Sequence, residues 1–349
     1  MARSDRGILV VLGCAAFATA CSPATGAPKS PPMEALLWPP PPEPPRVLFE
    51  RTLPAVETPA PGFWSRVGAF VIGVDPEAEA PQRLDRPFGL TLRQDSLVVT
   101  DPDVGALWRI PLDTGALTAF ECKGDLELVR PTGVAAAKDG TLYIADPGAG
   151  AVVMMTPQGR CDRRIGDGTL TRPTGVALFD APPTLAVSDT SLHQVVLFEL
   201  DGSVRRVLGR RGPADDAFNF PTHVAADVDG RLLVADALNF AIKTFSVSDG
   251  ELVGHFGFAG DGPGAFNKVK GVAVDAQGHV LVADAMQDSV FIFDRQGVFL
   301  LAFGGSGTDG GRLSLPTGVV TGDDGVIYVA DSLNRRVQVY RLLPEGGSP

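Results

Sequence analysis

Six aspartates are the residues of this chain whose type and spacing first suggest chemistry. They recur 43 to 48 residues apart, each at the end of an apolar stretch such as "LYIAD". They are Asp101, Asp146, Asp189, Asp236, Asp284 and Asp331. Paired carboxylates can perform acid–base catalysis, but a residue needed once in every repeat is typical of architecture. We therefore expect these aspartates to accept backbone N–H bonds across the turn that follows, as Asx turns do.

Other patterns that could support catalysis are incomplete. The stretch "GFAGDGPG" (257–264) resembles a phosphate-binding loop, but no Lys-Ser or Lys-Thr pair follows it. The stretch "DVDGRLLVADAL" has Leu232 where a calcium loop has glycine and Leu238 where it has glutamate. No Ser-His-Asp or Cys-His set can be assigned. The sequence therefore predicts no catalytic residue, no metal site and no cofactor.

Short strands in a repeated unit must position these aspartates. Each unit starts with a strand such as "RPTGVAA", "FPTHVAA" or "KVKGVAV", and a tight turn, most often Asp-Gly, leads to the strand that ends in aspartate. A third and a fourth strand follow. Four antiparallel strands in about 45 residues are typical of a β-propeller blade, whereas a β-sandwich does not repeat at this period. The sequence predicts an all-β fold of six blades over residues 85–343.

The sixth unit ends before its fourth strand, at "RVQVYRLLPEGGSP". The segment "RVLFERTLP", which precedes the first unit, has the character of the missing strand. A strand from the N-terminal side would leave no open sheet edge between the first and last blades. We predict that residues 46–53 close the last blade and that residues 344–349 are a tail.

The last unit, "LPTGVV…IYVADSLNRRVQVY" (315–340), resembles the NHL repeat of six-bladed propellers. The other units keep the Pro-Thr-Gly-Val and Val-Ala-Asp strands but lose the Asn-Arg pair. This resemblance implies a binding module. It implies no particular reaction, because one fold hosts many functions. Some propellers of the family are amidating lyases with several channel histidines on zinc. Here only His223 occupies the matching position, and catalytic zinc typically has three protein ligands.

The N-terminus has the features of an export signal. Arg3 and Arg6 precede the apolar run "GILVVLGCAAFATA", and small residues precede Cys21. The residues before Cys21 resemble the lipobox of bacterial lipoproteins, which implies a signal peptide over 1–20 and a lipid on Cys21. Cleavage before Cys14, or secretion without a lipid, are the alternatives. Ser22 after the cysteine implies sorting to the outer membrane.

Residues 21–45 are rich in proline, as in "WPPPPEPPRV", a lead-in that also resembles bacterial NHL-repeat lipoproteins. Such a segment favours extended polyproline II and predicts a tether; a PxxP ligand is the alternative. Residues 54–84 form an insert whose residues Phe63, Trp64, Val67, Phe70 and Val71 fall on one face of a short amphipathic helix. That helix could pack beneath the propeller or dock on a membrane or partner.

Departures from the repeat indicate where function could reside. The turns after each second strand and the inter-blade connections meet on one face of a propeller. The predicted binding residues on that face are His193, His223, Phe240, Lys270, Gln287, Asp288, Asn334 and Arg335. The net charge of −11 disfavours a nucleic-acid partner. We expect an exported, lipid-anchored binding or scaffold protein that engages envelope proteins; the alternative is a channel-site enzyme of lyase or lactonase type.

Two cysteines lie beyond the predicted lipidation site at Cys21, namely Cys122 and Cys161. Disulfides persist in an exported protein. Both cysteines fall near outer strands of neighbouring blades, and such strands diverge at the rim. This placement favours two free thiols over a bridge, although the sequence leaves both open.

Overall fold

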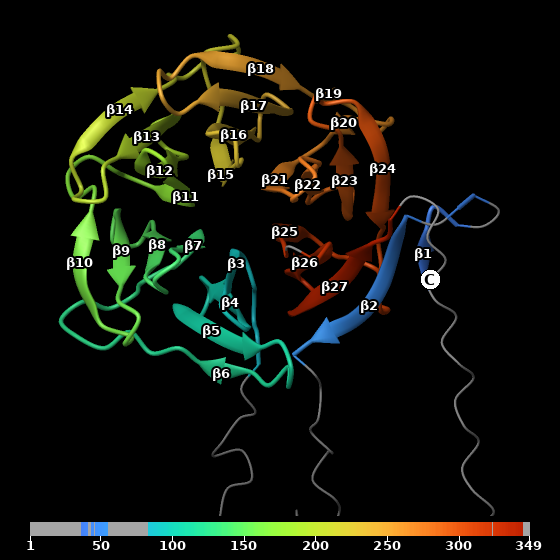
Figure 1. The fold of residues 1–349 in the computed structure, drawn as a ribbon, viewed down its shortest axis with the longest axis horizontal. Helices are drawn as coiled ribbons and strands as arrows, with labels where there is room; N and C mark the ends of the chain where they lie inside the picture. The colour runs from blue at the N-terminus through green and yellow to red at the C-terminus, as the bar shows by residue number, and fades with distance from the viewer. Residues whose placement is uncertain (1–35, 41–42, 45, 55–82, 323, 345–349) are drawn as a thin grey trace, which may run out of the picture. The chain divides into compact units, whose positions relative to one another are not determined.

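The structure is a computed structural model that describes residues 36–40, 43–44, 46–54, 83–322 and 324–344. In these ranges the chain forms strands and no helix. Six antiparallel sheets surround a central axis as the blades of a β-propeller (Figure 1). The predicted all-β fold with six blades is confirmed.

The first three blades each contain four strands in chain order, with the first strand innermost. Blade 1 comprises β3 (Leu90–Arg93), β4 (Ser96–Asp101), β5 (Ala106–Pro111) and β6 (Thr118–Ala119). Blade 2 comprises β7 (Val134–Ala136), β8 (Leu142–Asp146), β9 (Ala151–Met155) and β10 (Cys161–Ile165). Blade 3 comprises β11 (Pro173–Asp180), β12 (Pro183–Asp189), β13 (Gln194–Phe198) and β14 (Val204–Leu208).

The last three blades complete the ring. Blade 4 comprises β15 (Pro221–Ala226), β16 (Arg231–Asp236), β17 (Ala241–Ser246) and β18 (Leu252–Phe256). Blade 5 comprises β21 (Val269–Val274), β22 (Val280–Asp284), β23 (Ser289–Phe293) and β24 (Phe299–Gly304), preceded by the short parallel pair β19 (Phe258–Ala259) and β20 (Ala265–Phe266). Blade 6 contains β25 (Pro316–Thr321), β26 (Val326–Asp331) and β27 (Arg336–Leu342). Its innermost strand, β25, contacts β3 of blade 1.

The core lies between the blades. Each of six clusters of buried apolar side chains joins one pair of neighbouring blades. The second strand of a blade contacts these clusters on both of its faces, and every residue of β8, β22 and β26 is buried. This explains why sequences such as "LYIAD" and "VLVAD" are continuously apolar rather than alternating.

Close approach of the innermost strands explains the repeated glycine of the Pro-Thr-Gly-Val strand. A Cβ at each of these glycines would lie 2.2 to 2.6 Å from a backbone carbonyl oxygen of the next blade. The glycines are Gly89, Gly133, Gly175, Gly271 and Gly318. Blade 4 has His223 at this position, so it is the one blade with a side chain there.

The predicted closing strand is confirmed. Strand β2 (Val47–Leu53) pairs antiparallel with β27 as the fourth strand of blade 6, with Phe49 opposite Tyr340. A further strand, β1 (Leu37–Trp38), pairs with β2, although residues 21–45 were predicted to be a tether throughout. The indole of Trp38 packs against Tyr340 at a ring distance of 5.8 Å. The two residues of β1, Leu37 and Trp38, therefore belong to the propeller.

The expectation of two free thiols is wrong, because Cys122 and Cys161 form a disulfide with a Cα–Cα distance of 5.4 Å. After β6 the chain does not turn directly into blade 2. It first runs along β10, where Lys123 donates from its backbone N–H to the carbonyl of Gly159 at 2.8 Å. This detour brings Cys122 beside the outer strand of the next blade.

Several predicted segments lie outside the described residues. They are the signal peptide over 1–20, Cys21, most of the tether, the helix that contains Trp64, and the tail beyond residue 344. In the described part of the chain, no helix has the length and apolar character to cross a membrane.

Candidate ligand-binding site

The six repeated aspartates are structural. All are fully buried, and each accepts a backbone N–H from the connection that precedes the first strand of its own blade. In blade 2, for example, Asp146 accepts from Val129 at 2.7 Å and also from Gly148 and Ala149 in the following turn. The predicted Asx turn is therefore present at Asp146. The bond from Val129, 17 residues earlier in the chain, is an additional structural role of this aspartate. Burial raises the pKa of Asp101 and of Asp331.

The predicted binding residues of the turns after each second strand mostly hold neighbouring connections together. The His193 ring accepts the backbone N–H of Phe220 at 3.1 Å, and Asp288 accepts that of Leu315 at 2.8 Å. Gln287 donates to the carbonyl of Ala265. These polar side chains therefore have partners inside the chain, and their hydrogen bonds link each turn to an inter-blade connection.

The remaining turn residues differ in exposure. Asn334 donates to the carbonyl of Gly307, and Phe240 packs against the core between blades 4 and 5. Arg335 has a side chain that is 52% exposed and lies 3.6 Å from a carboxylate oxygen of Asp85. Arg335 is thus the predicted turn residue whose charge is presented to solvent.

Three departures from the repeat meet in the middle of the propeller. Phe88 and Lys270 replace the threonine of the Pro-Thr-Gly-Val strand in blades 1 and 5, and His223 replaces the glycine in blade 4. The His223 ring stacks on Phe88 with centroids 5.1 Å apart and planes inclined by 23°. The ammonium of Lys270 lies 5.7 Å from the centroid of the same ring. Sequence reasoning had singled out His223 and Lys270 but not Phe88.

A cavity of about 640 Å³ lies beside this cluster, on the face where the second strands end. All six blades contribute to its lining. Its residues are Arg86, Phe88, Pro102, Asp103, Arg130, Thr132, Pro147, Gly148, Thr171, Arg172, Thr174, Thr190, Ser191, Thr222, Lys270, Leu315, Thr317 and Ser332. The predicted face is therefore hollowed at its centre, with Lys270 in the lining.

The lining is basic. Arg86 and Arg130 share one carboxylate, Asp103, at 3.2 and 3.7 Å. Arg172 and Lys270 have no ion-pair partner among the described residues. Burial, followed by the charges of Lys268 and Arg172, lowers the pKa of Lys270 to about 8. The ammonium form still predominates at neutral pH.

His223 contributes no positive charge at neutral pH. Burial, and then the charge of Lys270, lower the pKa of its imidazole to about 3. Neither ring nitrogen has a hydrogen-bond partner among the described residues. The buried imidazole is thus neutral and acts on the cavity through its stacking on Phe88.

The arginines of the cavity carried a sequence signal that was not used. They precede the proline in "RPFG", "RPTG" and "RPTG" of blades 1 to 3, where blades 4 and 6 have Phe220 and Leu315. These three arginines are Arg86, Arg130 and Arg172. Their absence from the other blades, apart from a lysine in blade 5, was the departure that could have identified them.

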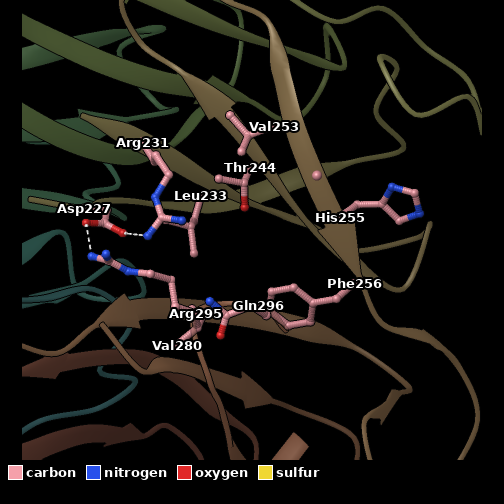
Figure 2. Close-up of a pocket in the computed structure, with 11 residues that line it drawn as sticks. Asp227, Arg231, Leu233, Thr244, Val253, His255, Phe256, Val280, Arg295 and Gln296 are labelled. Atoms are coloured by element: carbon pink, nitrogen blue, oxygen red, sulfur yellow. Dashed lines mark hydrogen bonds and ion pairs between the residues drawn. The ribbon is translucent and has the colours of Figure 1, made fainter. Parts of the chain in front are cut away.

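A second pocket, of about 230 Å³, lies at the opposite face between blades 4 and 5. Figure 2 shows Asp227 between the guanidinium groups of Arg231 and Arg295, with the imidazole of His255 turned away from them. Arg295 also pairs with Asp229 at 2.8 Å, so two carboxylates balance these two cations within the chain. In the described ranges, no three His, Cys, Asp or Glu side chains are grouped to hold a metal ion.

Comparisons with known proteins agree with this architecture. The NHL repeat model matches residues 313–340. The E3 ubiquitin-protein ligase TRIM32 of Mus musculus is 27% identical over 185 residues, which cover 47% of this chain and 27% of that protein. The human protein gives the same values. The similarity thus spans about a quarter of the length of these relatives.

Solved structures show the same fold at low identity. A putative gluconolactonase is 17% identical with a TM-score of 0.58, over 76% of this chain and 96% of that one. Virginiamycin B lyase from Staphylococcus aureus is 14% identical with a TM-score of 0.54, over 75% and 98% of the two chains. The chain is a six-bladed β-propeller that carries an NHL repeat at residues 313–340.

Proposed function

We propose that this protein is a binding or scaffold module that engages envelope proteins through the face that contains the basic cavity. The observation that carries the proposal is the cavity itself, to which all six blades contribute. Binding sites are concave and combine apolar surface with a few placed polar groups. The repeated aspartates are fully buried, whereas cations of this face such as Arg130 and Arg335 are exposed and available to a partner.

The proposal includes a lipid anchor on Cys21 and a location at the outer membrane with the propeller outside the cytoplasm. Its support is the order of residues before Cys21, in which basic residues are followed by an apolar run and then by small residues. The serine after Cys21 supports the outer-membrane location. A proline-rich segment extends by about 3.1 Å per residue, so residues 22–35 are long enough to separate the propeller from the membrane surface.

Capture of envelope proteins by the purified mature form tests the partner proposal. Arg335→Ala and Arg130→Ala remove exposed cations of the cavity face, with side chains 52% and 61% exposed. We expect each to weaken capture by about fivefold or more, because a few interface residues carry most of the affinity and arginine is enriched among them. Phe240 is a poor probe because it packs against the core.

Gln277→Ala is the control. This exposed residue lies in the turn between β21 and β22, at the opposite face. It should leave capture unchanged. Loss of capture in Gln277→Ala together with normal capture by both arginine variants would place the interface on the other face.

A channel-site enzyme of lyase or lactonase type is the second candidate. The observation that favours it is the amine of Lys270, whose pKa of about 8 leaves part of it unprotonated near neutral pH inside the cavity. Lysines with lowered pKa values serve as bases and nucleophiles. Turnover of a panel of lactones by the purified protein, abolished by Lys270→Thr, would favour the enzyme over the scaffold.

A further inference from the structure

We propose that the central cavity binds a small anion that carries two or more negative charges, a polycarboxylate or a phosphate, held between the ammonium of Lys270 and the guanidinium of Arg172. This inference goes beyond the proposed function. It concerns a small molecule inside the cavity, whereas the partner protein is proposed to contact the face around it.

The lining of the cavity carries an excess of positive charge. It contains four cations (Arg86, Arg130, Arg172 and Lys270) and one carboxylate (Asp103), which leaves an excess of three positive charges. The whole chain has a net charge of −11, so this cluster opposes the general composition. Like charges that are brought together destabilise their charged forms unless an opposite charge lies near them. An anion in the cavity supplies that charge.

Within the lining, Lys270 and Arg172 are the two cations whose charge is not balanced by a nearby carboxylate among the described residues. Asp103 lies between Arg86 and Arg130, whereas Lys270 and Arg172 have no carboxylate partner among the described residues. The charge of Arg172 is close enough to lower the pKa of Lys270. Two adjacent unpaired cations, one of them an arginine fork, match a carboxylate or a phosphate.

The ammonium of Lys270 lies over an aromatic ring before any ligand binds. It is 5.7 Å from the centroid of Phe88, and the same ring stacks on the imidazole of His223. His223 and Phe88 each occur once among the six blades at their repeat positions, as Lys270 does. A cation held in place before binding loses less conformational entropy when the ligand arrives.

The size and polarity of the cavity fit a small molecule. A volume of about 640 Å³ is within the range of small-ligand sites. Threonine and serine residues from four blades are part of its lining, and the hydroxyls of Thr190, Thr222 and Thr317 donate to backbone carbonyls within the chain. A nucleic acid requires a basic groove that follows its backbone, and the excess of acidic residues elsewhere opposes one.

The repeat itself provides fold-compatible variants. Blades 2, 3, 4 and 6 have threonine where blade 5 has Lys270, and blade 6 has a leucine where blade 3 has Arg172. Lys270→Thr therefore introduces the residue that four other blades already have at the same repeat position, and Arg172→Leu introduces the residue that precedes the first strand in blade 6. Lys138→Thr is the matched control, because Lys138 is an exposed lysine at the opposite face that pairs with Asp180.

Isothermal titration of the purified mature protein with citrate, inorganic phosphate and hexaglutamate tests the inference. We expect citrate or phosphate to bind, and Lys270→Thr and Arg172→Leu each to weaken that binding by about tenfold or more, as loss of a charged hydrogen bond does. Lys138→Thr should bind as the unchanged protein does. Melting temperatures show whether each variant is folded.

The pH dependence gives a second measurement. The anion requires the ammonium form of Lys270, which predominates below its pKa of about 8 and is lost above it. Affinity should therefore fall between about pH 7 and about pH 9.5, and the fall should be smaller in Lys270→Thr.

Three outcomes would overturn the inference. One is no binding of citrate or phosphate at concentrations up to about 10 mM. Another is equal affinity in Lys270→Thr and the unchanged protein. Binding of hexaglutamate alone would assign the cations to an acidic protein segment instead. Capture of envelope proteins is measured separately, so the two proposals can fail independently.

Discussion

At the residue scale, repetition separates structural side chains from candidate functional ones only in part. An aspartate ends the second strand in all six blades. Each of these side chains is buried and accepts backbone hydrogen bonds. Arg86, Arg130 and Arg172 are also repeated, yet they line the cavity. The difference lies in the number of blades: a residue required by every blade is architectural, whereas one present in adjacent blades only can create a local charge.

Lys243 carries a testable prediction about buried charge. Its ammonium lies 3.1 Å from Asp236 with both side chains buried, and it donates to the carbonyl of Ala214 at 2.9 Å. Lys243→Met should lower the free energy of unfolding by about 3 kcal/mol or more, because it removes the only cation paired with a fully buried carboxylate among the described residues. Urea denaturation measures this, and Lys138→Met, at an exposed pair, should change little.

His223 carries a prediction about pH. Its pKa is lowered from 6.5 to about 3 in the folded protein, so between these values the unfolded chain binds a proton that the folded chain does not. Stability should therefore fall as the pH falls below about 6.5, by at most about 1.4 kcal/mol per pH unit from this residue. His223→Gly, which restores the glycine of the other blades, should reduce that slope. An unchanged slope in urea denaturation at several pH values would show that His223 is not its source.

At the element scale, the last blade depends on chain segments from both ends of the propeller. β2 supplies its fourth strand and β1 its fifth. The edge of β27 would otherwise expose a row of unpaired backbone groups. Trp38 and Phe49 also pack on Tyr340, so closure contributes apolar contacts as well as hydrogen bonds.

Deletion of residues 46–53 should lower the melting temperature and promote aggregation, because it removes β2 and leaves β27 as an unpaired edge. Deletion of residues 22–34 is the control and should leave the melting temperature unchanged, since it removes no described strand. Thermal denaturation with light scattering measures both. Similar losses from the two deletions would contradict the assigned role of β2.

The disulfide joins the connection after β6 to β10. Replacing Cys122 and Cys161 together by alanine should lower the free energy of unfolding by about 2–4 kcal/mol, because the bond closes a loop between residues 39 apart in sequence. Mass spectrometry without reduction should find the bond in the unchanged protein. Two free thiols in the purified protein would contradict it.

At the scale of the whole molecule, a closed ring brings one residue from each blade to a common centre. Phe88, His223 and Lys270 come from blades 1, 4 and 5, and they contact one another because the first strands of all six blades surround the channel. The same arrangement places cations of blades 1, 2, 3 and 5 around one cavity.

The proposed lipid anchor would determine where the whole molecule is located. Cys21→Ala should abolish labelling with a lipid precursor and move the protein from the membrane fraction to the soluble fraction, because one cysteine is proposed to carry the lipid. Cys14→Ala should change neither. Labelling that depends on Cys14 alone would shift the cleavage site to that residue.

The sequence alone determined the blades, their number and the closing strand. These features depend on local patterns: Asp-Gly turns, apolar second strands and a repeat of about 45 residues, each of which acts within one blade. It also identified the face on which the cavity lies and two of the three residues of the central cluster, His223 and Lys270.

Only the tertiary structure decided which departures from the repeat meet. Four other predicted residues differ between blades as His223 does, yet their side chains hydrogen-bond to inter-blade connections. They are His193, Gln287, Asp288 and Asn334. Phe88 and Lys270 are 182 positions apart, and the Cys122–Cys161 bond depends on the path of one connection along β10. Contacts between blades depend on ring closure and on the course of single connections, and no local pattern within a blade specifies either one.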